Sequence, residues 1–242
     1  MSQVNEGESD RYRILAEKTR FIPGEPTKWR FEIVGPSGPP KSYRVQHERE
    51  LHLIVVRDDL TTFSHLHPER DDLGAWDVDL ELPLPGSYTA FADVAPDDVP
   101  ATTLRLKLIA EGVWTPSEVP AGMRSATIDD YLVELSGDVV ASEGSTITFI
   151  ITRGEEVVTT DPYLGAAGHL VAIKTRDLDY LHVHPIAGDE PGAIPFMIHA
   201  PSAGTYRLFL QFLHAGMVRT VDFTVHAMEP RDGEGNPEAH HG

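Results

Sequence analysis

The sequence contains no cysteine among its 242 residues. This absence excludes disulfides, thiolate zinc sites, catalytic thiols and the cysteine-ligated blue-copper centre. The chain also lacks any run of about 18 apolar residues, so we expect no direct membrane insertion. The N-terminal segment MSQVNEGESD has neither the basic nor the apolar region of a secretory signal. We expect a cytoplasmic protein if Met1 is the native start, and a protein of the cell envelope if an export segment has been lost.

Basic residues are scarce, with 20 Lys and Arg against 38 Asp and Glu and a formal charge of -18. Phosphate binding requires a basic face, so nucleic acid is not an expected partner. The same acidity favours attraction of cations. Nineteen prolines and twenty glycines, together with many Val, Ile and Thr residues, indicate strands and turns rather than long helices.

The chain contains an internal repeat. TKWRFEIV (27–34) aligns with STITFIIT (145–152), and HLIVVRDDLTTFSHLHP (52–68) aligns without a gap with HLVAIKTRDLDYLHVHP (169–185). A third segment, GAWDVDLELPLPGSYTAF (74–91), aligns with GAIPFMIHAPSAGTYRLF (192–209). Such self-similarity indicates two copies of one domain.

Each copy reads as about seven short strands separated by turn residues, which is typical of a β-sandwich. We therefore predict an all-β protein with two tandem Ig-like or cupredoxin-like β-sandwich domains related by duplication. The expected boundaries are 10–110 for the first domain, 111–128 for a linker, 129–227 for the second domain and 228–242 for a disordered tail.

Each copy contains a hairpin with the motif His-x-His-Pro. If Asp58 and Asp59 form a two-residue loop, His52 lies directly opposite His65, and His67 points to the same side of the sheet. A loop at 175–176 places His169 opposite His182 in the second copy, with His184 on their side. Three convergent imidazoles form a metal-binding set. The geometry predicts one such site in each domain, with these ligands: His52, His65 and His67, and His169, His182 and His184.

Each copy also offers a candidate region for a fourth ligand. Asp93 lies at the end of the strand that carries the Gly-x-Tyr signature, and Gln211 is its aligned counterpart. In the second copy, LHAGM (213–217) offers His214 and Met217 as substitutes. The remaining histidines have no repeated partner, and we assign them to the surface or regard them as incidental: His47, His199, His226, His240 and His241.

These hairpins carry a family resemblance. LHLIVVRDDLTTFSHLHP, YLGAAGHLVAIKTRDLDYLHVHP (163–185) and AGTYRLFLQF (203–212) resemble segments of bacterial tandem β-sandwich proteins associated with copper and heavy-metal handling. The resemblance covers most of residues 12–226. It implies metal binding at the two histidine triplets, and export or membrane anchoring.

Imidazole-rich sites without thiolate ligands favour Cu(II) or Zn(II). The resemblance and the order of divalent affinities place copper first and zinc second. The expected partners are a metal ion and a metal-transport or metallochaperone protein.

Two alternative functions remain open. Three histidines with an open coordination position could serve a metal-dependent enzyme, cupin-like or hydrolytic, although the chain lacks Gly-x-Ser-x-Gly, a phosphate loop and His-Glu-x-x-His. The chain could instead be a tandem Ig-like interaction module with structural histidines. Exposure separates the metal-binding and structural hypotheses: ligands should converge on an open rim, whereas structural histidines should be buried and hydrogen-bonded to backbone.

Overall fold

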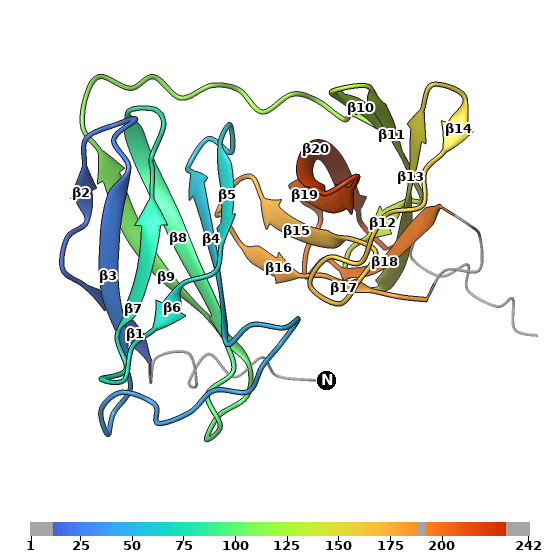
Figure 1. Ribbon diagram of the computed structural model, residues 1–242. Helices are drawn as coiled ribbons and strands as arrows, with labels where there is room; N and C mark the ends of the chain where they lie inside the picture. The colour runs from blue at the N-terminus through green and yellow to red at the C-terminus, as the bar shows by residue number, and fades with distance from the viewer. Residues whose placement is uncertain (1–11, 188–191, 231–242) are drawn as a thin grey trace, which may run out of the picture.

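The computed structural model describes residues 12–187 and 192–230. Within these ranges the regular structure consists of strands alone, arranged as two β-sandwiches that lie side by side (Figure 1). The predicted all-β fold with two tandem sandwiches is therefore confirmed. Residues 231–242, which make up most of the predicted tail, lie outside the described residues.

The first sandwich consists of two sheets. One has the strand order β1-β3-β7-β6, with bounds Arg13–Ala16, Thr27–Val34, Trp76–Leu80 and Glu69–Arg70. The other has the order β2-β9-β8-β4-β5, with bounds Arg20–Phe21, Thr102–Ala110, Gly86–Val94, Leu51–Arg57 and Phe63–Leu66. Their inward-facing residues form a core that includes Trp29, Phe31, Trp76 and Tyr88.

The second sandwich repeats this topology. One sheet has the order β10-β11-β13-β18-β17, with β14 paired to β13; the bounds are Ser125–Ile128, Tyr131–Ser136, Gly144–Arg153, Ala193–His199 and His184–Pro185, and Glu156–Val157 for β14. The other has the order β12-β20-β19-β15-β16, with bounds Val139–Val140, Met217–Met228, Gly204–His214, His169–Lys174 and Tyr180–His182. Strand β10 lies within the segment predicted as linker.

Details of the backbone support the duplication. Gly86 and Gly204, which open the equivalent strands β8 and β19, have φ angles of 140° and 138°. A side chain rarely adopts this conformation, so glycine is required at both positions. Two residues on, the hydroxyls of Tyr88 and Tyr206 each donate a 2.8 Å hydrogen bond to the carbonyl four residues upstream. The repeated Gly-x-Tyr signature thus encodes one local structure twice.

The predicted hairpin registers are wrong by two residues. His65 pairs with Ile54 rather than His52, and His182 pairs with Val171 rather than His169. Both loops contain four residues instead of two. The Arg57 amide donates to the Thr62 carbonyl in the first copy, and the Lys174 amide donates to the Asp179 carbonyl in the second. Each loop holds one leucine with positive φ. A shift of two positions preserves the face of every side chain, so the histidines still share one side of the sheet.

The two sandwiches pack through their equivalent hairpin sheets (Figure 1). All seven residues of β4 are buried, since one face covers the first core and the other contacts the second sandwich. The rings of Phe63 and Phe209 stack with centroids 4.3 Å apart, and those of Phe91 and Tyr180 stack at 5.4 Å. Phe63 is the counterpart of Tyr180, and Phe91 of Phe209, so the junction has approximate two-fold symmetry.

The linker is anchored at this junction. The Ser117 amide donates a 3.0 Å hydrogen bond to the Asp59 carboxylate, and the Arg57 guanidinium lies over the Trp114 ring. Val119 packs against the apolar cluster between the sandwiches. The connection therefore adds contacts to the junction between the two domains.

Candidate metal centre at the junction of the sandwiches

The first predicted triplet converges in the structure. His52 lies on β4, His65 on β5, and His67 follows β5 where the chain crosses to β6 in the opposite sheet. One ring nitrogen from each residue lies within 4.8 Å of the others. His52 Nδ1 and His65 Nε2 are 2.9 Å apart. The His-x-His spacing therefore brings together the three side chains for which it was singled out.

Two further histidines join this triplet. The ring of His169, from the second sandwich, has its centroid 6.4 Å from that of His52 and 6.3 Å from that of His65. The ring of His47 lies 5.0 Å from His169 and 6.1 Å from His52. The assignment of His47 as a surface or incidental residue was therefore wrong. Five histidines therefore form one cluster across the junction: His47, His52, His65, His67 and His169.

The two most buried histidines have matching hydrogen bonds. His52 and His169 are 5% and 8% exposed, and each Nε2 lies 2.9 Å from a backbone carbonyl, that of Gln46 or Tyr163. These carbonyls belong to equivalent turns in which residues 47 and 164 have positive φ. A carbonyl oxygen only accepts, so Nε2 carries the proton and a neutral ring presents the lone pair of Nδ1. The repeated turn thus fixes the tautomer of both rings.

His65 is held by the other sandwich. Its Nδ1 lies 2.6 Å from Oε1 of Gln211, a residue of β19 that is 7% exposed. Because Oε1 accepts, Nδ1 of His65 donates and its Nε2 carries a lone pair. Two lone pairs, on His52 Nδ1 and His65 Nε2, then face each other across 2.9 Å. A cation between these nitrogens would satisfy both.

Protonation is a poor source of that cation. Burial, aided by the neighbouring His52, His67 and His169, lowers the pKa of His65 to about 3. Burial, aided by His52, lowers the pKa of His67 to about 4. Near neutral pH these rings are uncharged, which is the form that binds metals. Among the described residues, no group hydrogen-bonds to the buried Nε2 of His67.

A small cavity adjoins the cluster. Its volume is about 20 Å³, and its polar lining comes from His47, His52, His65, Asp93, His169 and Tyr180. This volume is enough for one water molecule or ion. Asp93 is 5% exposed and opposite His52 on the neighbouring strand, as Gln211 is opposite His169. Burial, the Asp93 carboxylate and a hydrogen bond to it raise the pKa of Tyr180 well above its usual value.

Four other residues were considered as ligands in the second sandwich: His182, His184, His214 and Met217. The backbone of His184 pairs with Met197 in the opposite sheet, while the side chains of His182 and His184 lie outside the part that the structure describes. His214 forms a 2.8 Å hydrogen bond through Nδ1 with the Tyr131 hydroxyl, and the described structure does not place it in the histidine cluster. Met217 pairs with His214 at the β19–β20 turn and is 56% exposed.

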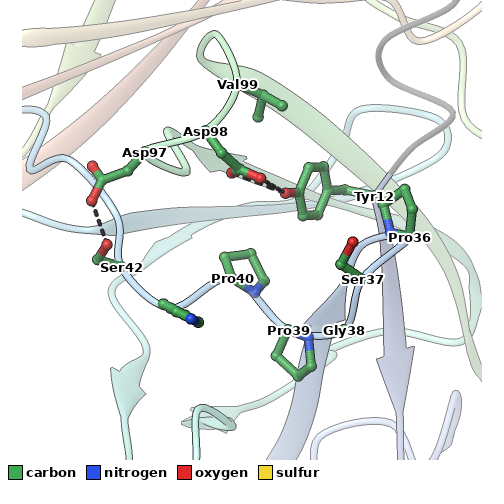
Figure 2. Close-up of a pocket in the computed structure, with 11 residues that line it drawn as sticks. Tyr12, Pro36, Ser37, Gly38, Pro39, Pro40, Ser42, Asp97, Asp98 and Val99 are labelled. Carbon is green, nitrogen blue, oxygen red and sulfur yellow. Dashed lines mark hydrogen bonds between the residues drawn. The ribbon is translucent and has the colours of Figure 1, made fainter.

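A much larger cavity, of about 690 Å³, lies beside the proline-rich loop of residues 36–42 (Figure 2). The Tyr12 hydroxyl donates to both oxygens of Asp98 across this cavity, at 3.0 and 2.8 Å. None of the predicted ligands lines it. The cavity is therefore separate from the histidine cluster.

The exposure criterion gives a divided result. His52 and His169 are buried and hydrogen-bonded to backbone, as expected of structural histidines. His65 and His67 are partly exposed, as expected of ligands at a rim. Metal-binding histidines commonly donate their second nitrogen to a carbonyl, so the backbone bonds fit either role.

A family model described as "Domain of unknown function (DUF8832)" matches residues 7–107 and 126–229. The chain belongs to the DUF8832 family. Its two matched segments correspond to the two sandwiches of this DUF8832 protein. Among curated proteins, no match was found.

Several solved structures share a low overall similarity with this DUF8832 chain. The Escherichia coli adhesin FdeC is 11% identical over 90% of this chain and 64% of its own, with a TM-score of 0.29. The Yersinia pseudotuberculosis adhesin InvE is 11% identical over 90% and 59%, with a TM-score of 0.30. Escherichia coli alpha-2-macroglobulin is 12% identical over 90% and 20%, with a TM-score of 0.33. The chain spans less than two thirds of the length of each.

A membrane-spanning helix, long and apolar enough to cross a bilayer, does not occur in the described residues.

Proposed function

We propose that this protein binds a metal ion at His52, His65 and His67 and acts in metal handling. The observation that carries the proposal is the facing pair of ring nitrogens, His52 Nδ1 and His65 Nε2, 2.9 Å apart with their other nitrogens already committed. His67 supplies a third nitrogen within 4.8 Å of both.

The separation of the two facing nitrogens is close to that expected of two ligands on one metal ion. Two nitrogens bound to one tetrahedral zinc are about 3.3 Å apart, given metal–nitrogen distances of about 2.0–2.1 Å. The observed 2.9 Å separation therefore requires an opening of a few tenths of an ångström. Neutral imidazoles suit both copper and zinc, and the order of divalent affinities favours Cu(II), with Zn(II) second. A metal-transport or metallochaperone protein is the partner that this role would require.

Titration of the 242-residue chain with Cu(II) and with Zn(II) tests the proposal. His240 and His241 are replaced by Ala in the parent protein, so that the terminal pair does not bind metal. We expect tight copper binding, with nitrogen hyperfine structure in the electron paramagnetic resonance spectrum. His67→Ala should weaken binding more than about tenfold, since loss of a mere hydrogen-bond partner of a ligand already costs roughly 10–100-fold.

His199→Ala is the matched control, because His199 is an exposed histidine on β18. It should leave copper affinity unchanged. Binding of neither metal by the parent protein, or equal loss in the His67 and His199 variants, would contradict the proposal.

A tandem Ig-like interaction module is the second candidate function. The observation that favours it is the pair of backbone hydrogen bonds from His52 and His169, which hold each buried ring within its own sandwich without an ion. In this function the histidines stabilise the docking of the sandwiches, and partners bind elsewhere. Absence of metal binding, combined with loss of stability in His52→Ala and His169→Ala, is the result that this function predicts.

A further inference from the structure

We infer that Gln211 of the second sandwich is a positioning residue for the metal site of the first. The inference rests on the proposed function and adds to it a dependence on domain docking. Gln211 lies on β19, whereas its partner His65 lies on β5, 146 residues earlier in the chain. The ligand would thus be oriented by a side chain that is present only when the sandwiches are docked.

The hydrogen bonds of Gln211 define how it acts. Its Oε1 accepts from His65 Nδ1 at 2.6 Å, and its Nε2 donates to the Thr220 hydroxyl at 3.1 Å. This arrangement keeps the proton of His65 on Nδ1, so that Nε2 faces His52. Rotation of the amide by half a turn would reverse the effect. The amide nitrogen would then donate to Nδ1, and His65 Nε2 would carry the proton and bond His52 instead of a metal.

The approximate symmetry of the junction adds an independent observation. Asp93 occupies the position in the first sandwich that Gln211 occupies in the second. Asp93 on β8 is opposite His52 on β4, and Gln211 on β19 is opposite His169 on β15. Asp93 is hydrogen-bonded to Tyr180 of the second sandwich. Each sandwich therefore extends one buried polar side chain to the hairpin of the other. A carboxylate at this position can only accept, which is the role assigned to the oxygen of Gln211.

Two substitutions separate this role from simple packing. Gln211→Glu retains an acceptor that cannot reverse, and Gln211→Met keeps the length of the side chain but removes the acceptor. We expect Gln211→Glu to bind copper at least as tightly as the parent protein. Gln211→Met should bind about 10–100-fold more weakly, the usual cost of losing the hydrogen-bond partner of a ligand. Copper affinity is measured by competition with a chelator.

The tautomer of His65 is the readout that packing would not change. Nitrogen-15 correlation spectra of the metal-free chain should show the proton on Nδ1 in the parent protein and in Gln211→Glu. The spectrum of Gln211→Met should lose this preference. These spectra need no metal, so they test the inference even if the titrations show that the protein binds none.

Three results would overturn the inference. The first is a proton on Nε2 of His65 in the metal-free parent protein. The second is an unchanged tautomer in Gln211→Met. The third applies if the parent protein binds copper, and it is a copper affinity of Gln211→Met equal to that of the parent. Unfolding curves of both variants, matched to the parent, establish that the sandwiches remain folded.

Discussion

The imidazole rings of His47 and His169 meet edge to face, with centroids 5.0 Å apart, although the residues belong to different sandwiches. His169 is in turn 6.4 Å from His52 by ring centroids. Histidines of the two halves therefore share one environment. Their chemistry is expected to be coupled.

Coupling makes a prediction about stoichiometry. Replacement of His65 and His67 by Ala would leave the second domain's binding unchanged if the two triplets were independent. Because His169 lies beside the first triplet, we expect these substitutions also to weaken the copper binding that remains. Calorimetric titration of the double variant and of His169→Ala measures this effect. One remaining equivalent of unchanged affinity would show independent sites.

Acid should destabilise the metal-free protein. Burial lowers the pKa of His65 to about 3 and those of His67 and His169 to about 4, whereas unfolded histidine titrates near pH 6.5. Below about pH 6.5 the unfolded chain binds protons that the folded chain does not. The free energy of unfolding should therefore decrease as the pH falls from about 6.5 to 4, and stay flat above that range.

Urea midpoints measured between pH 7.5 and 5.5 check this dependence before most carboxylates titrate. A variant with His65→Gln and His67→Gln should lose part of the slope. Identical slopes in the variant and the parent protein would show that these rings do not carry the effect.

The aromatic stack between the sandwiches should couple their unfolding. Phe209 is 3% exposed and stacks on Phe63 of the other sandwich. Phe209→Ala should cost about 3–5 kcal/mol, because a large buried ring is removed. The lost free energy comes from the contact between the sandwiches, so the two sandwiches should unfold separately. Calorimetry should then resolve two unfolding transitions where the parent protein shows one. Val113→Ala, at a side chain 94% exposed, should change stability by less than about 0.5 kcal/mol.

The anchor of the linker depends on a buried ion pair. Arg57 Nη1 and Asp59 Oδ2 are 3.3 Å apart, with side chains 9% and 2% exposed. Asp59→Ala leaves Arg57 without this partner, and we expect a loss of about 3–5 kcal/mol in the free energy of unfolding. It also removes the acceptor of the Ser117 amide, so limited proteolysis should cleave the linker faster.

Asp138→Ala is the control for this change, because its ion pair with Arg124 is exposed at both ends. An exposed pair contributes about 0–1 kcal/mol. Equal effects of the two substitutions on proteolysis would mean that Asp59 does not anchor the linker.

The repeat and the period-two alternation were sufficient to predict the fold and the shared face of His52, His65 and His67. The alternation did not determine the register, because RDDLTT has the composition of a tight turn but forms a four-residue loop with Leu60 at positive φ. The three histidines converge nevertheless, because a register shift of two residues keeps their side chains on the same face of the sheet.

His47 was missed because it lies in a turn and its counterpart is Leu164, so comparison of the two copies gave no signal. The docking of the sandwiches, in contrast, has a signal in the sequence. LHLIVV in β4 has no polar position except the histidine, and an uninterrupted apolar strand indicates burial on both faces. Residues that are distant in sequence, such as His65 and Gln211, could be joined only after this docking was known.

The approximate two-fold symmetry of the junction bears on how docking of the two halves depends on protein concentration. Two separate single-sandwich chains could form the same Phe63–Phe209 and Tyr180–Phe91 contacts only above the concentration at which such a pair associates. Residues 111–124 join the halves covalently, and a short linker gives its two ends an effective concentration of about millimolar. The docking equilibrium that assembles the histidine cluster is therefore independent of the concentration of the chain.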